Sequence, residues 1–234
     1  MDKTSNTATR RATGIRCVIF DCDGTLVDSE ILCNQALVNI FNRLGANLSI
    51  EECLRHFQGG KMVDILTDTR ERAGIKTRID DLEPMYRKEC RRLFEQGLTP
   101  IQGVPELLDT LSSMGFDMCI ASNAPISKIE HTLSLTGLLP YFEGKLFSGF
   151  QANSWKPEPD ILHFAAMHMG VMLKECVFVD DTPKGVQAGI NAGIRTFHFA
   201  ATPHSVKIKH PRVTTITAMP QLLDYLEEDL SPVS

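Results

Sequence analysis

Five short apolar runs limit the fold of this chain more than any other feature of its sequence. Each run is bounded by polar residues or glycine, and segments with helical spacing separate the later runs. Such short runs favour strands, and their alternation with helices is typical of a parallel sheet covered on both faces. The sequence therefore predicts a doubly wound parallel α/β sheet. The runs are CVIF (17–20), FDMCIA (116–121), KLFSG (145–149), CVFV (176–179) and RTFHF (195–199).

A long segment without a convincing strand interrupts this alternation between the first run and the second. It shows helical patterns, several of which end at glycine, a common helix stop signal. Ser49 and Glu52 have the spacing of a capping box at the start of one of these helices. We therefore predict an all-helical domain that is inserted into the α/β core. The predicted boundaries are residues 31–98 for the insertion, and residues 14–30 and 99–234 for the core.

The overall composition excludes several classes of protein. With 234 residues, 43% hydrophobic and 23% charged, the chain matches an ordinary globular protein. A net charge of -5 argues against binding to nucleic acid or to an anionic membrane, and no apolar run approaches the ~20 residues of a membrane span. Seven scattered cysteines without a CxxC pair favour reduced thiols over disulfides or a zinc site. We expect a cytoplasmic monomer whose residues 1–13 form a flexible extension.

Polar side chains follow three of the apolar runs at the point where each run ends. Ligands of an open α/β sheet bind beyond the carboxyl ends of the strands, so these groups should converge on one edge. Lys156, in SWKPEPD, precedes a helix and lies in a loop that we expect at the same edge. The other groups are Asp21 and Asp23 after the first run, Ser122 and Asn123 after the second, and Asp180 and Asp181 after the fourth.

The carboxylates at this edge need compensation. Asp21 and Asp23, on one face of a strand, repel unless one is protonated, both are solvated, or a cation lies between them. With Asp180 and Asp181 they oppose Lys156 alone, which leaves an excess of about three negative charges. A hard divalent cation would offset most of this excess, and Mg²⁺ is the common choice where a phosphate completes its coordination. We therefore predict Mg²⁺ and a phosphoryl group, with one carboxylate as nucleophile and another as acid/base.

Four motifs together give the chain a resemblance to a known superfamily. FDCDGTLVDSE, IASNA, the lysine of SWKPEPD and VFVDDTPKG resemble the motifs of the haloacid dehalogenase-like (HAD) superfamily. The helical insertion resembles the cap domain of its β-phosphoglucomutase-like branch. This resemblance implies an Mg²⁺-dependent phosphatase of small phosphorylated metabolites, sugar phosphates such as 6-phosphogluconate among them. Asp23 is absent from the dehalogenases of the superfamily, so its presence disfavours dehalogenation here.

The resemblance also implies a role for each residue at the sheet edge. Asp21 would attack phosphorus and form an aspartyl-phosphate, while Asp23 would protonate the leaving alkoxide and later activate water. Ser122, the Asn123 backbone and Lys156 would bind the phosphoryl group. Mg²⁺ would be held by the Asp21 carboxylate, the Asp23 backbone carbonyl and Asp181, with Asp180 helping directly or through water.

We expect the QGGK turn at residues 58–61 to be the part of the cap domain that determines substrate specificity. Its glycines allow the backbone to approach a ligand closely, and the resemblance implies that Lys61 meets a distal carboxylate or hydroxyl. A simple turn with a solvated lysine is the alternative. Two other functions stay open: a hexose-phosphate mutase with the same core, and a non-catalytic sensor of a phosphorylated ligand. Asp23 argues against the sensor, which needs no proton donor.

Overall fold

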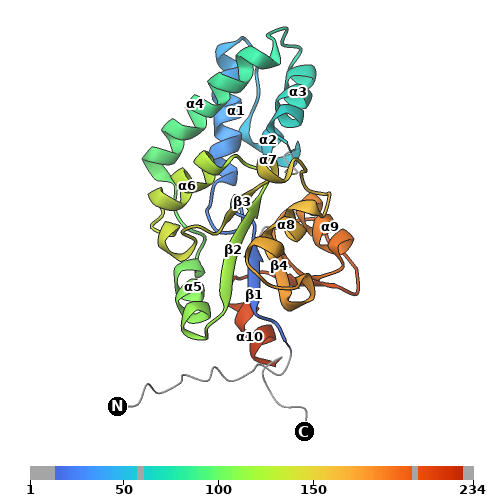
Figure 1. The fold of residues 1–234 in the computed structure, drawn as a ribbon. Coiled ribbons are helices and arrows are strands. Elements are labelled where there is room, and N and C mark those ends of the chain that lie inside the picture. Colours follow the sequence, from blue (N-terminus) through green and yellow to red (C-terminus); the bar gives the residue numbers. More distant parts are fainter. Residues whose placement is uncertain (1–13, 57–60, 202–204, 229–234) are drawn as a thin grey trace, which may run out of the picture.

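The fold is a six-stranded parallel sheet with helices on both faces, seen in a computed structural model that describes residues 14–56, 61–201 and 205–228 (Figure 1). Its strand order is β3-β2-β1-β4-β5-β6, and this arrangement confirms the predicted doubly wound α/β class. The predicted N-terminal extension and residues 58–60 of the QGGK turn lie outside the described residues. The strands are β1 (Cys17–Phe20), β2 (Asp117–Ser122), β3 (Leu146–Ser148), β4 (Cys176–Asp180), β5 (Arg195–Phe199) and β6 (Val213–Ile216).

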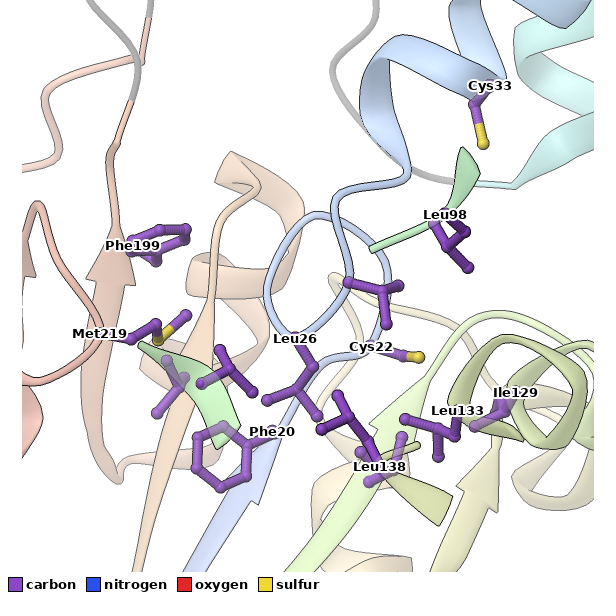
Figure 2. Close-up of a cluster of buried hydrophobic side chains, with 14 of the residues drawn as sticks. Phe20, Cys22, Leu26, Cys33, Leu98, Ile129, Leu133, Leu138, Phe199 and Met219 are labelled. Carbon is purple, nitrogen blue, oxygen red and sulfur yellow. The ribbon is translucent and has the colours of Figure 1, made fainter. Parts of the chain in front are cut away.

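Side chains of β1 alternate between two hydrophobic cores, one on each face of the sheet. Val18 and Phe20 belong to one core, and Cys17 and Ile19 belong to the other, as the two-residue period of a strand requires. Figure 2 shows Phe20 and Leu26 in the first of these cores. Helices α5 (Val104–Ser113), α6 (Ile126–Leu135) and α10 (Gln221–Glu228) contribute to that core, whereas α8 (Asp160–His168) and α9 (Pro183–Ala192) contribute to the second. The central strand is therefore buried on both sides, which fixes the position of the residues that follow it.

The helices of the core lie before, between and after the later strands. Two short 3₁₀ turns, η1 (Leu139–Tyr141) and η2 (Leu173–Glu175), complete the connections. Within the described part of the chain, no helix is both long and apolar enough to cross a membrane. The core helices are α5 (Val104–Ser113), α6 (Ile126–Leu135), α7 (Gly149–Ala152), α8 (Asp160–His168), α9 (Pro183–Ala192) and α10 (Gln221–Glu228).

Four helices between β1 and α5 lie beyond the carboxyl ends of the strands, at the top of Figure 1. The predicted capping box is present: the Ser49 N–H donates to Glu52 Oε2 at 2.9 Å, and the Glu52 N–H donates to Ser49 Oγ at 3.2 Å. We call these helices the cap, and their exact domain boundaries stay a prediction. The cap helices are α1 (Glu30–Arg43), α2 (Ile50–His56), α3 (Met62–Ala73) and α4 (Ile79–Gly97).

The sixth strand, β6, is an element that the sequence analysis did not predict. It pairs with β5 alone at the edge of the sheet, and within its sequence VTTI only Ile216 is buried. A short edge strand of this kind lacks the apolar run that reveals a buried strand. The missed strand extends the sheet but lies away from β1, β2 and β4, after which the candidate site residues fall.

Candidate active site

The carboxyl ends of β1, β2 and β4 form the floor of the candidate active site. Asp21 directly follows β1, while Ser122 and Asp180 are the last residues of β2 and β4 rather than the first beyond them. Because β1 lies between β2 and β4, these residues meet where the strand order changes direction, which is where open α/β sheets bind ligands. The structure thus brings together three distant parts of the sequence.

Lys156 reaches this floor from the loop before α8. Its ammonium donates to Asp21 Oδ1 at 2.6 Å and to Asp180 Oδ2 at 2.7 Å, and its side chain is only 4% exposed. The Asn123 side chain holds that loop, since its Oδ1 accepts the Lys156 backbone N–H at 2.8 Å. The other oxygen of Asp180 accepts two hydrogen bonds from Thr182, each of 2.8 Å. Asp180 therefore orients Lys156 with one oxygen and is itself held by the other.

Three carboxylates at the floor form a possible metal site. Asp21, Asp180 and Asp181 each place an oxygen within 4.8 Å of the others. Thr25 orients Asp181 by donating to its Oδ1 at 2.8 Å. Gly24 leaves space for the same carboxylate: its φ is +76°, and a Cβ there would lie 2.4 Å from Asp181 Oδ2. Clustered carboxylate oxygens are the donor set that Mg²⁺ and other hard cations prefer.

The acids of this cluster have too little positive charge around them. Burial raises the pKa of Asp21 to about 7, because the opposing effect of Lys156 does not overcome burial and the nearby charge of Asp180. Burial, together with Asp180 and Asp21, also raises the pKa of Asp181 well above its ordinary value. A carboxyl group whose pKa rises in this way lacks stabilising partners for its ionised form. The cluster therefore fits a metal cation, which would supply the missing charge.

Asp23 binds a second lysine, Lys128 of α6, which the sequence analysis missed. The Lys128 ammonium donates to Asp23 Oδ2 at 2.6 Å, and the Ser29 hydroxyl donates to Oδ1 at 2.9 Å. Burial alone would raise the pKa of Asp23, but Lys128 and Ser29 together hold that pKa below its ordinary value. The predicted charge balance of four carboxylates against one lysine is therefore wrong. Two lysines pair with these four carboxylates, which leaves an excess of about two negative charges, the amount that one divalent cation would balance.

The position of Lys128 in the sequence could have predicted that it lies at the site. Helix α6 follows β2 and begins at the edge where the strands end, and Lys128 is its third residue. Side chains in the first turn of such a helix lie near the ligand site of an open α/β sheet. Lys128 belongs to no motif that the sequence analysis considered, so only this placement marks it.

The floor opens into a cavity of about 940 Å³ between the sheet edge and the cap. Every predicted site residue lines this cavity except Asp180, which is fully buried. Ser122 is 3% exposed, and its hydroxyl accepts the Ala124 N–H at 3.2 Å. Lys61 precedes α3, and its ammonium lies 4.1 Å from the ring centroid of Trp155. Lys61 thus reaches the cavity, but among the described residues it forms no ion pair with a carboxylate.

Comparison with known proteins identifies the family. A family model of haloacid dehalogenase-like hydrolases matches residues 15–193. The chain therefore belongs to the haloacid dehalogenase-like hydrolase family, which confirms the predicted superfamily and the prediction of a hydrolase. The 6-phosphogluconate phosphatase of Escherichia coli (strain K12) is 41% identical over 208 residues, which cover 89% of this chain and 93% of that protein.

Solved structures show the same architecture. A conserved haloacid dehalogenase-like protein of unknown function from Agrobacterium tumefaciens str. C58 matches with a TM-score of 0.76 and 29% identity, covering 92% of this chain and 98% of the other. A putative beta-phosphoglucomutase from Thermotoga maritima matches with a TM-score of 0.73 and 24% identity, covering 92% of this chain and 99% of the other. The second match bears on the fold alone, and it agrees with the predicted β-phosphoglucomutase-like architecture.

Proposed function

We propose that this protein is an Mg²⁺-dependent phosphatase that hydrolyses small phosphorylated metabolites through an aspartyl-phosphate on Asp21. The charge arrangement of the site carries the proposal. Asp21 pairs with Lys156 at the base of a cavity and lies beside Asp180 and Asp181, an acid cluster that lacks compensation. Membership of a hydrolase family and similarity to a phosphatase from E. coli support the same reaction.

Asp21 and the groups around it would perform the first chemical step. Lys156 and the Ser122 hydroxyl, with the Asn123 backbone N–H, would donate hydrogen bonds to the phosphoryl oxygens. A carboxylate oxygen of Asp21 would attack phosphorus, forming a new P–O bond as the bond to the ester oxygen breaks. The electron pair of the broken bond stays on the ester oxygen. Lys156 already contacts Asp21 at 2.6 Å, so its charge lies where the phosphoryl group would arrive.

Asp23 would move the protons of both steps. In the first step it would give a proton to the ester oxygen as the alcohol leaves. The negative charge of the bound phosphoryl group would oppose the effect of Lys128 and raise the pKa of Asp23, so that it can carry this proton. In the second step it would take a proton from the water that attacks the aspartyl-phosphate, which releases inorganic phosphate and restores Asp21. Asp23 lines the same cavity as Asp21, so both would meet a substrate bound there.

The acid cluster would hold the metal. The Asp21 carboxylate, Asp181 and the Asp23 backbone carbonyl would bind Mg²⁺, and Asp180 would help chiefly by holding Lys156. When bound, Mg²⁺ supplies positive charge that offsets the carboxylates and the phosphoryl oxygens.

Sugar phosphates such as 6-phosphogluconate are the proposed substrates. A cavity of about 940 Å³ has room for a sugar chain beyond the phosphoryl group. Lys61, Lys88 and Arg91 line the cavity on the cap side and could offer positive charge to a distal carboxylate. Arg87 also lines it but is paired with Glu83 at 2.7 Å, and Glu30 and Asp64 add negative charge to the same lining. The E. coli relative is a phosphatase of this compound by its name.

Release of inorganic phosphate from matched esters tests the proposal. We expect Mg²⁺-dependent release from 6-phosphogluconate, at a higher kcat/KM than from glucose 6-phosphate, which has the same carbon number but no carboxylate. Undiminished activity in excess EDTA would refute the role of the metal. Conversion of a hexose phosphate to an isomer without phosphate release would instead identify a mutase.

A further inference from the structure

Lys128 and Lys156 form ion pairs with different carboxylates of the site. Lys156 contacts Asp21 and Asp180, whereas Lys128 contacts Asp23 at 2.6 Å. The two lysines come from different parts of the core, the loop before α8 and the first turn of α6. The proposed nucleophile and the proposed proton carrier therefore each have a cationic partner of their own.

Both oxygens of Asp23 are held by groups from different elements. Lys128 of α6 binds Oδ2, and Ser29, which precedes α1, binds Oδ1 at 2.9 Å. The last torsion of an aspartate side chain has a broad, shallow preference, so these two partners decide where its oxygens lie. The side chains of Lys128 and Asp23 are 31% and 28% exposed, which leaves them open to the cavity yet partly shielded from water. Such shielding makes the ion pair stronger than one on the surface.

We propose that Lys128 is a positioning residue, which holds the Asp23 carboxylate in the place from which it serves the ester oxygen and the hydrolytic water. This inference rests on the proposed function, in which Asp23 moves the protons. Lys128 acts through Asp23 and binds no part of the substrate. A misplacement of about 1 Å in a reacting group can cost on the order of 10²-fold in rate, so loss of this contact should be visible in turnover.

A double-mutant cycle with two substrates tests the inference. Lys128→Met should lower kcat for 6-phosphogluconate about 10- to 100-fold with little change in KM, because the misplaced group acts in the chemical step. Lys128→Arg should restore most of the lost rate, since arginine can form the same ion pair. For p-nitrophenyl phosphate, whose leaving group needs no proton, the loss should be smaller than for 6-phosphogluconate, because only the activation of water still depends on the position of Asp23. In an Asp23→Asn background, Lys128→Met should cause no further loss, because its effect passes through Asp23.

Lys174→Met is the matched control, since Lys174 is exposed and lies in η2, outside the cavity lining. It removes the same charge and should leave both activities unchanged. Thermal unfolding checks that each variant is folded, and Lys128→Gln takes the place of Lys128→Met in the cycle if the methionine variant does not fold.

The outcomes separate this inference from the proposed function. An increase in KM for both esters, or a further loss in the Asp23→Asn background, would show that Lys128 contacts the substrate directly and would overturn the inference. Unchanged kcat in Lys128→Met would overturn it as well, while leaving the proposed function intact if Asp23→Asn is impaired. If Asp23→Asn itself turns over 6-phosphogluconate at the wild-type rate, the proposed role of Asp23 fails, and the inference fails with it.

Discussion

Both the cap and the core bury carboxylates, but they compensate them in opposite ways. In the cap, Glu89 of α4 has a side chain that is 7% exposed and that binds Arg92 at 2.6 Å and Arg43 at 2.9 Å, with Asn39 at 2.7 Å. Hydrogen bonds from Arg92 lead the interactions that lower the pKa of Glu89 to about 2. One acid thus has two guanidinium partners, and its negative charge is fully stabilised within the fold.

In the core the balance is reversed. Asp21 and Asp180 share one ammonium, that of Lys156, while Asp181 accepts a hydrogen bond from Thr25. Burial raises the pKa of both Asp21 and Asp181. A buried acid can stabilise the fold, in which case charged partners within the protein balance it, or it can bind a ligand, in which case that balance is incomplete. The comparison supports the proposal that the acid cluster of the core, rather than the better paired acid of the cap, binds a cation and a phosphoryl group.

Removal of the proposed nucleophile of the core should have the largest effect on activity. Asp21→Asn has almost the same volume as the native side chain, but an amide cannot attack phosphorus, so turnover should fall on the order of 10⁶-fold. The fold should remain, because the substitution removes an under-compensated buried charge. Phosphate release and thermal unfolding check these two expectations. Phosphate release within about tenfold of the wild type would contradict the assignment of Asp21 as nucleophile.

Weakening of the metal site should have the next largest effect. Loss of a partner outside the ligand set already costs about 10- to 100-fold in metal affinity, so Asp181→Ala should weaken Mg²⁺ activation by at least about 100-fold. High Mg²⁺ should then restore part of the activity, since the other oxygens still form an incomplete site. Titration of activity with Mg²⁺ after EDTA treatment measures this. An unchanged Mg²⁺ dependence would remove Asp181 from the metal site.

At the cap side of the cavity, Lys61 should affect only substrates long enough to reach it. A charge-assisted hydrogen bond to a carboxylate is worth roughly 1.5 to 3 kcal/mol, so Lys61→Ala should lower kcat/KM for 6-phosphogluconate about 10- to 150-fold. Hydrolysis of p-nitrophenyl phosphate should hardly change. An equal loss for both substrates would indicate that the contact between Lys61 and Trp155 serves closure of the cap, and the role in specificity would be withdrawn.

The paired acid of the cap should affect stability and leave chemistry nearly unchanged. Glu89→Gln should lower the free energy of unfolding by about 1 to 3 kcal/mol, because hydrogen bonds to charged groups are lost, while kcat stays close to wild type. The pKa of Glu89 is about 2 in the folded protein and 4.5 as its ordinary value, so its charge stabilises the fold above pH 4.5.

This contribution should disappear as the pH falls from about 4.5 towards about 2, where the folded protein also takes up the proton. Denaturant unfolding of wild type and Glu89→Gln at neutral and acidic pH measures it. A difference in stability between the two proteins that does not shrink in acid would show that the charge of Glu89 is not the cause.

The spacing of motifs along the chain was enough to predict that acids gather at one edge of the sheet. Asp21 and Asp181 follow apolar runs, and parallel strands of one sheet end at a common edge, so convergence did not depend on details of packing. The same reasoning placed Lys156 in a loop at that edge, where it pairs with Asp21. It could not predict β6, because an edge strand with one buried residue has no strong pattern.

The sequence by itself determined the alternation of the first five strands with helical segments, and the acids at the carboxyl ends of β1 and β4, because these depend on local backbone periodicity. Only the tertiary structure decided that Lys128 meets Asp23, a residue 105 positions away in the chain, and that Lys61 lies over Trp155. Whether a long side chain reaches a given carboxylate depends on where its helix rests against the sheet. For α6 that position is set by the packing of Ile129 and Leu133 into the core, and no local pattern around Lys128 records it.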